Sequence, residues 1–365
     1  MGCHLRWVGW SSLALAAASL ALAGRPAAAQ LQFSSADGGT SLKLGTLVQL
    51  QAQSIDNADA TDQAKDLYFR RLRLIGLFKW GDKVSVFFQT DDPNLGKGNP
   101  DGTKNVNNSI LFQDFVVTYA FAHELQIDGG EILIADSYNH NQSSSQLMPL
   151  DFGPFTFTET AAIQANVGRD YGAQARGYLA NDHLEYRLGV FQGKRGVGET
   201  NAFRYAGRLS LWVLGPQTGN FYRGTSLGKV QSLEIGGSFD KQKQFSVYDG
   251  DFYWDQPVGN GDGITVQFDY TKWDGGTFLT AIPKQNTTLA EVGYYLGAVK
   301  LQPYFQYSQE KFDDHAFPNQ KRTTLGLGFY PYGHTSDVKF AYTRLQQTGA
   351  VTREQFQLQF QVYIW

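Results

Sequence analysis

The sequence predicts an all-β protein, a transmembrane antiparallel β-barrel of about 16 strands that follows an N-terminal export signal. Three observations predict this fold class. A short apolar segment opens the chain, polar and apolar residues alternate along most of the remaining chain, and tight turns alternate with longer polar connections. Aromatic residues make up 14% of the chain and 40 of its 365 residues are glycine. After the first segment no apolar run is long enough for a membrane helix, so the apolar residues are spread along strands that lipid could cover.

Residues 1–29 have the layout of a secretory signal peptide. Arg6 supplies a positive charge, residues 8–22 are apolar and rich in Ala and Leu, and 27–29 form an A-x-A cleavage site before Gln30. A transmembrane helix is the alternative, but the apolar run is short for a span of about 20 residues. The only cysteine, Cys3, lies in this segment, so we expect no disulfide and no cysteine-ligated metal in the barrel domain, residues 30–365.

Period-two alternation predicts the strands, because it places one set of side chains on each face of a sheet. The clearest example is the C-terminal run, where apolar residues alternate with glutamines at positions 355, 357, 359 and 361. Such a row of glutamines suits the wall of a water-filled pore. We expect strands at 41–53, 67–80, 84–90, 110–121, 125–134, 169–180, 184–192, 202–214, 231–239, 245–254, 263–273, 287–297, 300–309, 322–332, 337–346 and 353–364.

The connections between these strands predict the topology. Tight turns are expected near 81–82, 122–124 and 181–183, and longer polar stretches at 91–109 and 135–168, as for periplasmic turns and extracellular loops. Residues 215–230 are the exception, being either an extended periplasmic loop or a misassigned strand. The longest connection, 135–168, is too apolar for a freely solvated loop, and we expect it to fold into the barrel and narrow the pore.

Strand parity separates lumenal from lipid-facing side chains. In 202–214, most odd positions are apolar, which places Arg204 and Arg208 inside, where an arginine avoids a cost of about 2–4 kcal/mol at the bilayer midplane. Arg70 falls on the lipid parity near a strand end. The same parity predicts six arginines that line the pore and bind anions: Arg71, Arg73, Arg176, Arg187, Arg204 and Arg208. The alternative is that these arginines pair with lumenal acids such as Asp170 and merely rigidify the barrel.

Charge and motifs narrow the function classes. Removing the signal leaves 29 basic residues (31 minus Arg6 and Arg25) against 34 acidic ones, a balance of −5, which does not suit a nucleic-acid binder. We find no catalytic motif and expect no catalytic residue, no cofactor and no metal site. The acidic and histidine residues at 313–315, and the aspartates at 91, 92 and 101, fit solvated loops better than metal ligands.

Five short motifs spread over most of the mature chain carry a family resemblance. They are Arg169-Asp170-Tyr171-Gly172-Ala173-Gln174 with Gly177, Tyr186-Arg187-Leu188-Gly189-Val190-Phe191-Gln192-Gly193, Phe69-Arg70-Arg71-Leu72-Arg73-Leu74, Ala206-Gly207-Arg208 and Leu301-Gln302-Pro303-Tyr304. Together they resemble the phosphate-selective porin O and P family. The resemblance implies a 16-stranded barrel, usually trimeric, with an inward-folded loop and basic residues along a pore for anions such as phosphate.

The resulting expectation is a homotrimeric porin in the outer membrane of a Gram-negative bacterium, in contact with lipid, through which small hydrophilic solutes diffuse passively. An anion or phosphate preference is the narrower expectation; the 135–168 loop contains no Lys or Arg, so the solute stays open. Two alternatives are a barrel that binds a partner or ligand through its loops and a barrel hydrolase. Trp365 falls on the parity of the glutamines, and a β-bulge near Tyr363 would return it to the lipid face.

Overall fold

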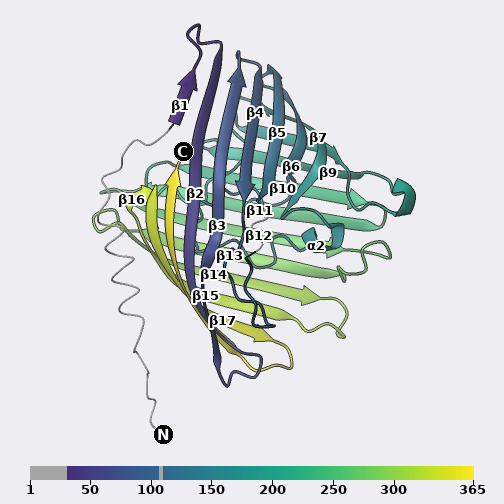
Figure 1. Cartoon of the computed structure of the whole chain (residues 1–365), viewed down its shortest axis with the longest axis vertical. Coiled ribbons are helices and arrows are strands. Elements are labelled where there is room, and N and C mark those ends of the chain that lie inside the picture. Colours follow the sequence, from purple (N-terminus) through teal and green to yellow (C-terminus); the bar gives the residue numbers. More distant parts are fainter. Residues whose placement is uncertain (1–30, 107–109) are drawn as a thin grey trace.

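The computed structural model describes residues 31–106 and 110–365, which form one β-barrel (Figure 1). The predicted signal peptide lies outside the described residues. Within the described residues, one short α-helix, α2 (Thr160–Ile163), and one 3₁₀ turn, η1 (Val197–Glu199), interrupt the connections. The strands are β1 (Leu31–Ser34), β2 (Thr40–Asp56), β3 (Gln63–Trp80), β4 (Val84–Asp91), β5 (Leu111–Ala122), β6 (Leu125–Leu133), β7 (Arg169–Leu179), β8 (Leu184–Phe191), β9 (Arg204–Leu214), β10 (Ser232–Gln242), β11 (Phe245–Val258), β12 (Asp262–Asp274), β13 (Gln285–Tyr295), β14 (Leu301–Phe312), β15 (Gln320–Phe329), β16 (Pro331–His334), β17 (Ser336–Gln347) and β18 (Arg353–Ile364).

Sixteen of these strands close the barrel. Each pairs antiparallel with its neighbour in the sequence, and β18 pairs with β2 through Gln359 opposite Gln51 and Gln361 opposite Gln49. The predicted count of 16 is confirmed, and every predicted strand overlaps an observed one. The two additional strands are short: β1 extends the barrel along β2, and β16 lies in the connection before β17. In the described part of the chain, no helix is long and apolar enough to cross a membrane.

The side chains of each strand alternate between the two faces of the wall as the parity predicts. On β12, Phe268 and Tyr270 point outward and are exposed, whereas their neighbours Gln267 and Asp269 are buried inside. This alternation gives an apolar outer surface suited to lipid and a polar inner surface, which is the pattern of outer-membrane barrels.

Two local expectations were wrong. The β2–β3 register skips Arg70, because Gln49 pairs with Arg71 and the next residue of β2 pairs with Phe69. This bulge turns Arg70 toward the lumen instead of toward lipid. By contrast, the β17–β18 and β18–β2 registers run without a shift, so no bulge forms near Tyr363. Trp365 therefore stays on the inner side, where Lys43 Nζ lies 4.4 Å from the centre of its ring.

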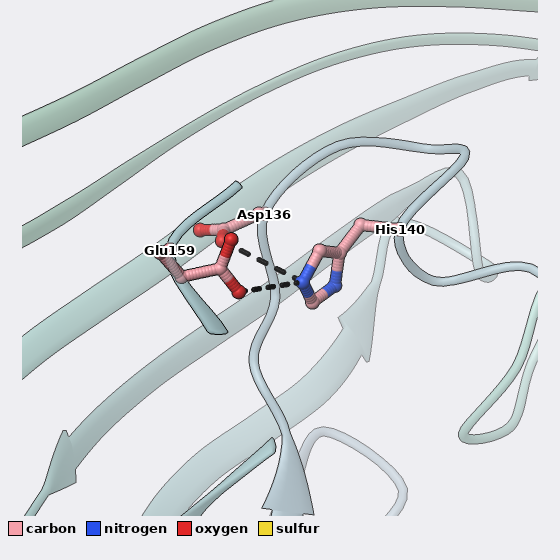
Figure 2. A group of neighbouring side chains, drawn as sticks. All are labelled: Asp136, His140 and Glu159. Atoms are coloured by element: carbon pink, nitrogen blue, oxygen red, sulfur yellow. Dashed lines mark hydrogen bonds and ion pairs between the residues drawn. The ribbon is translucent and has the colours of Figure 1, made fainter. Parts of the chain in front are cut away.

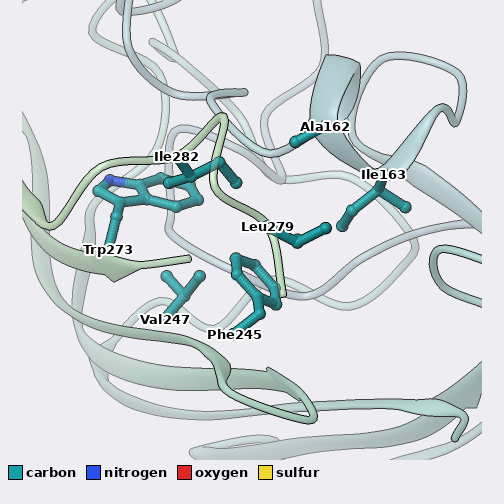
Figure 3. Close-up of a cluster of buried hydrophobic side chains, with 7 residues drawn as sticks. All are labelled: Ala162, Ile163, Phe245, Val247, Trp273, Leu279 and Ile282. Atoms are coloured by element: carbon teal, nitrogen blue, oxygen red, sulfur yellow. The ribbon is translucent and has the colours of Figure 1, made fainter. Parts of the chain in front are cut away.

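A buried apolar cluster holds the second half of the long β6–β7 connection against the barrel (Figure 3). This half contains α2 and is called the far arm of the connection. The cluster joins the helix α2 to the inner face of β11 and β12 and to the connection that follows β12. Its members are Ala162, Ile163, Phe245, Val247, Trp273, Leu279 and Ile282. The apolar residues of the loop are thus packed inside the barrel, which explains why the loop sequence is less polar than that of a solvated loop.

Candidate channel constriction

The β6–β7 connection, residues 134–168, crosses the lumen from one wall to the other. Near its start, the Asn139 amide nitrogen donates to Asp269 of β12 at 2.9 Å. Five strands further round the wall, Gln361 of β18 donates from Nε2 to the Ser145 carbonyl oxygen, also at 2.9 Å. Asp151 then pairs with Arg71 of β3, which lies nearly opposite β12. The cluster around α2 then returns the chain to β11 and β12. This path lies within the barrel, so the connection has the placement expected of a loop that narrows a channel.

The β9–β10 connection, residues 215–231, enters the lumen and meets this loop. Tyr222 forms a parallel bridge with Gln142, and its carbonyl oxygen accepts a hydrogen bond from the Ser143 amide nitrogen at 2.8 Å. The ring of Tyr222 stacks on Tyr138 with centroids 5.0 Å apart, and Tyr138 stacks on Tyr253 at 4.2 Å. Residues 215–230, whose length suggests an extended periplasmic loop or a misassigned strand, therefore belong to an inward-folded connection. It fills the barrel beside β9 and β11.

The space that remains lies beside the opposite wall. A cavity of about 410 Å³ is bounded by the inner faces of β2, β3, β14, β15, β17 and β18, by the β6–β7 loop and by the β4–β5 connection. Glutamines of β2 and β18 form part of its wall, as the alternation predicts. The charged residues that line it are Arg70, Arg71, Arg73, Lys97, Arg169 and Arg322, against Asp91 and Asp151. Six basic and two acidic side chains give this cavity a formal charge of +4.

Two adjacent arginines of β3 share one carboxylate of the loop. Arg70 Nε lies 2.7 Å from Asp151 Oδ2, and Arg71 Nη2 lies 2.6 Å from Asp151 Oδ1. Both can reach it because the bulge at Arg70 directs two consecutive side chains inward. Burial raises the pKa of Asp151, but the two guanidiniums lower it more, so that it lies well below its usual range. The carboxylate is therefore ionised and leaves the pair of arginines with one positive charge.

The bulge also brings a loop lysine to the cavity. The Phe69 amide nitrogen donates to the Leu95 carbonyl oxygen at 2.9 Å, which holds the β4–β5 connection against β3. Two residues later, Lys97 Nζ lies 4.9 Å from the centre of the Tyr68 ring. Burial and, to a smaller extent, the repulsion from Arg70 lower the pKa of Lys97.

The remaining basic groups differ in how far they are neutralised. Arg73 pairs with Asp91 at 2.8 Å, and Arg169 pairs with Asp114 at 3.1 Å. Arg322 packs its guanidinium 5.4 Å from the centre of the Phe155 ring. Among the residues that the structure describes, neither Lys97 nor Arg322 forms an ion pair, so both retain their charge toward the cavity.

Four of the six arginines predicted from parity do not line this cavity. They lie on the inner wall as parity requires, but on β7, β8 and β9, where the two inward connections fill the lumen. Each is buried and paired with carboxylates at 2.6–3.3 Å, which is the arrangement of the rigid-barrel alternative. The pairs are Arg176 with Asp128, Arg187 with Glu185, Arg204 with Asp170 and Asp240, and Arg208 with Glu234 and Asp251.

Comparison with known proteins agrees with this geometry. The family model for phosphate-selective porins O and P matches residues 42–221, a stretch that runs from β2 through the β6–β7 connection and ends within the β9–β10 connection. Over this stretch the chain is similar to the phosphate-selective porin O and P family. The porin matches none of the curated proteins. The family match and the closed 16-stranded barrel together identify an outer-membrane porin, and they point to a channel and not to an enzyme.

Solved porins share the fold at low sequence identity. The anion-selective porin from Comamonas acidovorans superposes with a TM-score of 0.58 at 13% identity, covering 89% of this chain and 99% of that one. Salmonella typhi OmpF, solved in complex with daunomycin, gives 0.59 at 13% identity, with 91% and 100% covered. The outer membrane channel DcaP of Acinetobacter baumannii gives 0.57 at 12% identity, with 91% and 99% covered. These likenesses establish the barrel and leave the solute to the residues of the porin itself.

Several residues of the cavity were not predicted from the sequence. Arg70 was assigned to lipid, although two consecutive arginines in a membrane strand are themselves a signal: one would face lipid at a cost of about 2–4 kcal/mol unless a bulge turned it inward. Lys97 and Asp151 lie in connections, where parity gives no orientation. Arg169 is the first residue of β7 and Arg322 is the third residue of β15, and strand ends are uncertain by a few residues when they are predicted from sequence.

Proposed function

We propose that this porin is an anion-preferring diffusion channel whose selective region is the basic cavity between the β6–β7 loop and β3. The single observation that carries the proposal is the excess of six basic over two acidic side chains along the space that the loop leaves open. A small anion entering it would exchange part of its hydration shell for guanidinium and ammonium donors, which lowers its entry barrier, whereas a cation is repelled.

The charge available to a solute comes from a few groups. Asp151 neutralises one of the two arginines it bridges, and Asp91 neutralises Arg73. Lys97 and Arg322 stand on different sides of the cavity and add one charge each. Of the six arginines expected to bind anions, the proposal keeps Arg71 and Arg73 and adds Arg70, Lys97 and Arg322.

The narrowing itself is assigned to residues 135–168, the loop expected to form a constriction. Its crossing of the lumen and its anchoring on both walls support this role. The basic groups come from the wall and from the β4–β5 connection, whereas the loop contributes the acidic Asp151. We further propose export by the signal peptide at 1–29 and assembly as a homotrimer, as the family resemblance implies. The mass of the detergent-solubilised porin, measured by light scattering, would test the trimer.

The proposal is tested by reconstituting the purified porin in a planar bilayer and measuring the reversal potential across a KCl gradient. We expect a potential of the sign that indicates chloride permeating faster than potassium. A zero or potassium-selective potential would contradict the proposal. Adding phosphate to a chloride solution distinguishes a phosphate-selective channel from a general anion channel. A phosphate-selective site would reduce the chloride current, whereas a general anion preference leaves the chloride current nearly unchanged.

A further inference from the structure

A second group of charged side chains lies inside the constriction loop, away from the cavity. Asp136 and His140 stand near the start of the loop, and Glu159 immediately precedes α2 on its far arm (Figure 2). His140 Nε2 lies 3.4 Å from Glu159 Oε1 and 3.8 Å from Asp136 Oδ2. Figure 2 shows the three side chains converging on one point. The role proposed for the porin does not use these groups.

The three side chains are buried and incompletely satisfied. Their exposed fractions are 2% for Asp136, 1% for His140 and 1% for Glu159. Both carboxylate oxygens of Asp136, and Oε2 of Glu159, have no hydrogen-bond partner in the described part of the chain. An unpartnered buried carboxylate is costly, because burial removes its water without replacing the lost interactions. Its oxygens are therefore available to a ligand that the protein chain alone does not supply.

The surroundings add negative charge. Arg208 donates to the Asp136 carbonyl oxygen at 2.8 Å, but its guanidinium already pairs with two carboxylates of the wall. Arg204, which interacts electrostatically with Asp136 and Glu159, likewise pairs with two others. Two guanidiniums thus face four wall carboxylates before Asp136 and Glu159 are counted. A cation between the loop residues would reduce this imbalance.

We propose that Asp136, His140 and Glu159 bind a divalent metal ion that ties the two arms of the constriction loop together. The donor set consists of one imidazole nitrogen and carboxylate oxygens. Such a set favours zinc and similar transition-metal ions, whereas calcium prefers oxygen ligands alone. Ligand atoms around tetrahedral zinc lie about 3.3 Å apart, and the three here lie within 4.8 Å of one another, so small side-chain shifts complete the site. Water would occupy the positions that the three residues leave.

The imidazole is already held in the orientation this role requires. Its ring packs against Phe157 at a centroid distance of 4.6 Å. Gly168, which has φ of +69°, lies so close that a Cβ there would come within 2.8 Å of His140 Cε1. The ring therefore keeps Nε2 toward the two carboxylates, while Nδ1 can carry the ring proton. Metal binding would fix the start of the loop, at Asp136 and His140, relative to Glu159 beside α2.

The test uses untagged porin purified from outer membranes, loaded with zinc and washed, with metal content measured by mass spectrometry. We expect one zinc ion per chain in the wild type. The near-isosteric variants Asp136→Asn and His140→Gln should raise the Kd for zinc at least about tenfold. His123→Gln is the matched control, because His123 pairs with Asp182 on exposed turns and should leave zinc binding unchanged.

Two results would overturn the proposal: a wild-type porin that binds no zinc, or variants that bind zinc as well as the wild type does. Should the variants fail to fold, copper loaded into the His123→Gln porin gives a separate readout. Electron paramagnetic resonance should then detect one imidazole nitrogen at the copper ion, and its absence would equally refute the site. The chloride preference is measured independently, so failure of the metal site leaves the proposed function standing.

Discussion

Replacing Lys97 and Arg322 by glutamine tests the selective cavity most directly, because both side chains line it without an ion-pair partner among the described residues. Their removal changes the formal charge of the lining from +4 to +2 and breaks no ion pair. A change in selectivity can then be attributed to charge rather than to a rearranged wall.

The size of the effect depends on the dimensions of the cavity. A space of about 410 Å³ corresponds to a sphere of about 5 Å radius, which puts a central ion about 8 Å from charged atoms of the wall. In water a unit charge at that distance contributes about 0.5 kcal/mol, and screening at about 0.1 M salt reduces this to about 0.2 kcal/mol. The same wall charge stabilises an anion and destabilises a cation by this amount, so the two contributions add in the permeability ratio. Each removed charge should therefore lower the chloride-to-potassium permeability ratio about twofold, and the double variant about fourfold.

The assay is the reversal potential of single channels across a KCl gradient, repeated at high salt. The decrease in the chloride-to-potassium permeability ratio should be smaller at high salt, since screening weakens the field of each charge. Lys311→Gln with Arg344→Gln is the matched control, because these residues are exposed, form no ion pair among the described residues and do not line the cavity. A double variant at positions 97 and 322 with the wild-type reversal potential, or a control that shifts as far, would refute the assignment.

Three further predictions concern pH, the filled side of the barrel and the loop anchor. Because burial lowers the pKa of Lys97, raising the pH should deprotonate Lys97 before it deprotonates an exposed lysine. The chloride preference should therefore fall at alkaline pH. Lys97→Arg should abolish this pH dependence in the same bilayer assay. Arg204→Ala leaves Asp170 and Asp240 without their cation and should cost about 3–5 kcal/mol of unfolding free energy in urea, with an unchanged reversal potential; loss of selectivity instead would return this arginine to the conducting path. Ile163→Ala removes a core side chain from the α2 cluster and should weaken the loop anchor by about 2–5 kcal/mol, which we expect to see as larger or noisier single-channel conductance; a steady wild-type current would mean that the cluster does not hold the constriction.

The barrel could be predicted from the sequence because its information is local. Alternation along β12 or β18 fixes which side chains face lipid, and one strand pairs with the next, so neither the count nor the order of strands requires knowledge of distant contacts. The bulge at Arg70 escaped prediction because a single extra residue reverses the parity of only a few positions.

The interior could be predicted much less well. Whether Arg71 or Arg204 borders open space depends on where two connections, 134–168 and 215–231, fold inside the barrel. Their packing rests on single contacts such as Tyr222 against Tyr138, which no periodic pattern encodes. His140 and Glu159 are 19 residues apart in an irregular segment, so their proximity likewise leaves no mark in the sequence.

The pairing of β2 with β18 has a consequence for how the barrel assembles. This seam joins residues about 300 positions apart, such as Gln51 and Gln359, and is therefore the slowest contact to find. Glutamines of both seam strands border the open cavity, whereas the packed side of the interior is built from the consecutive strands β7–β13. The inward connections can thus settle on a half-formed sheet. Closure of the seam then pairs two strands whose inner faces are polar: some of their glutamines face the cavity, and others, such as Gln361, hydrogen-bond the loop.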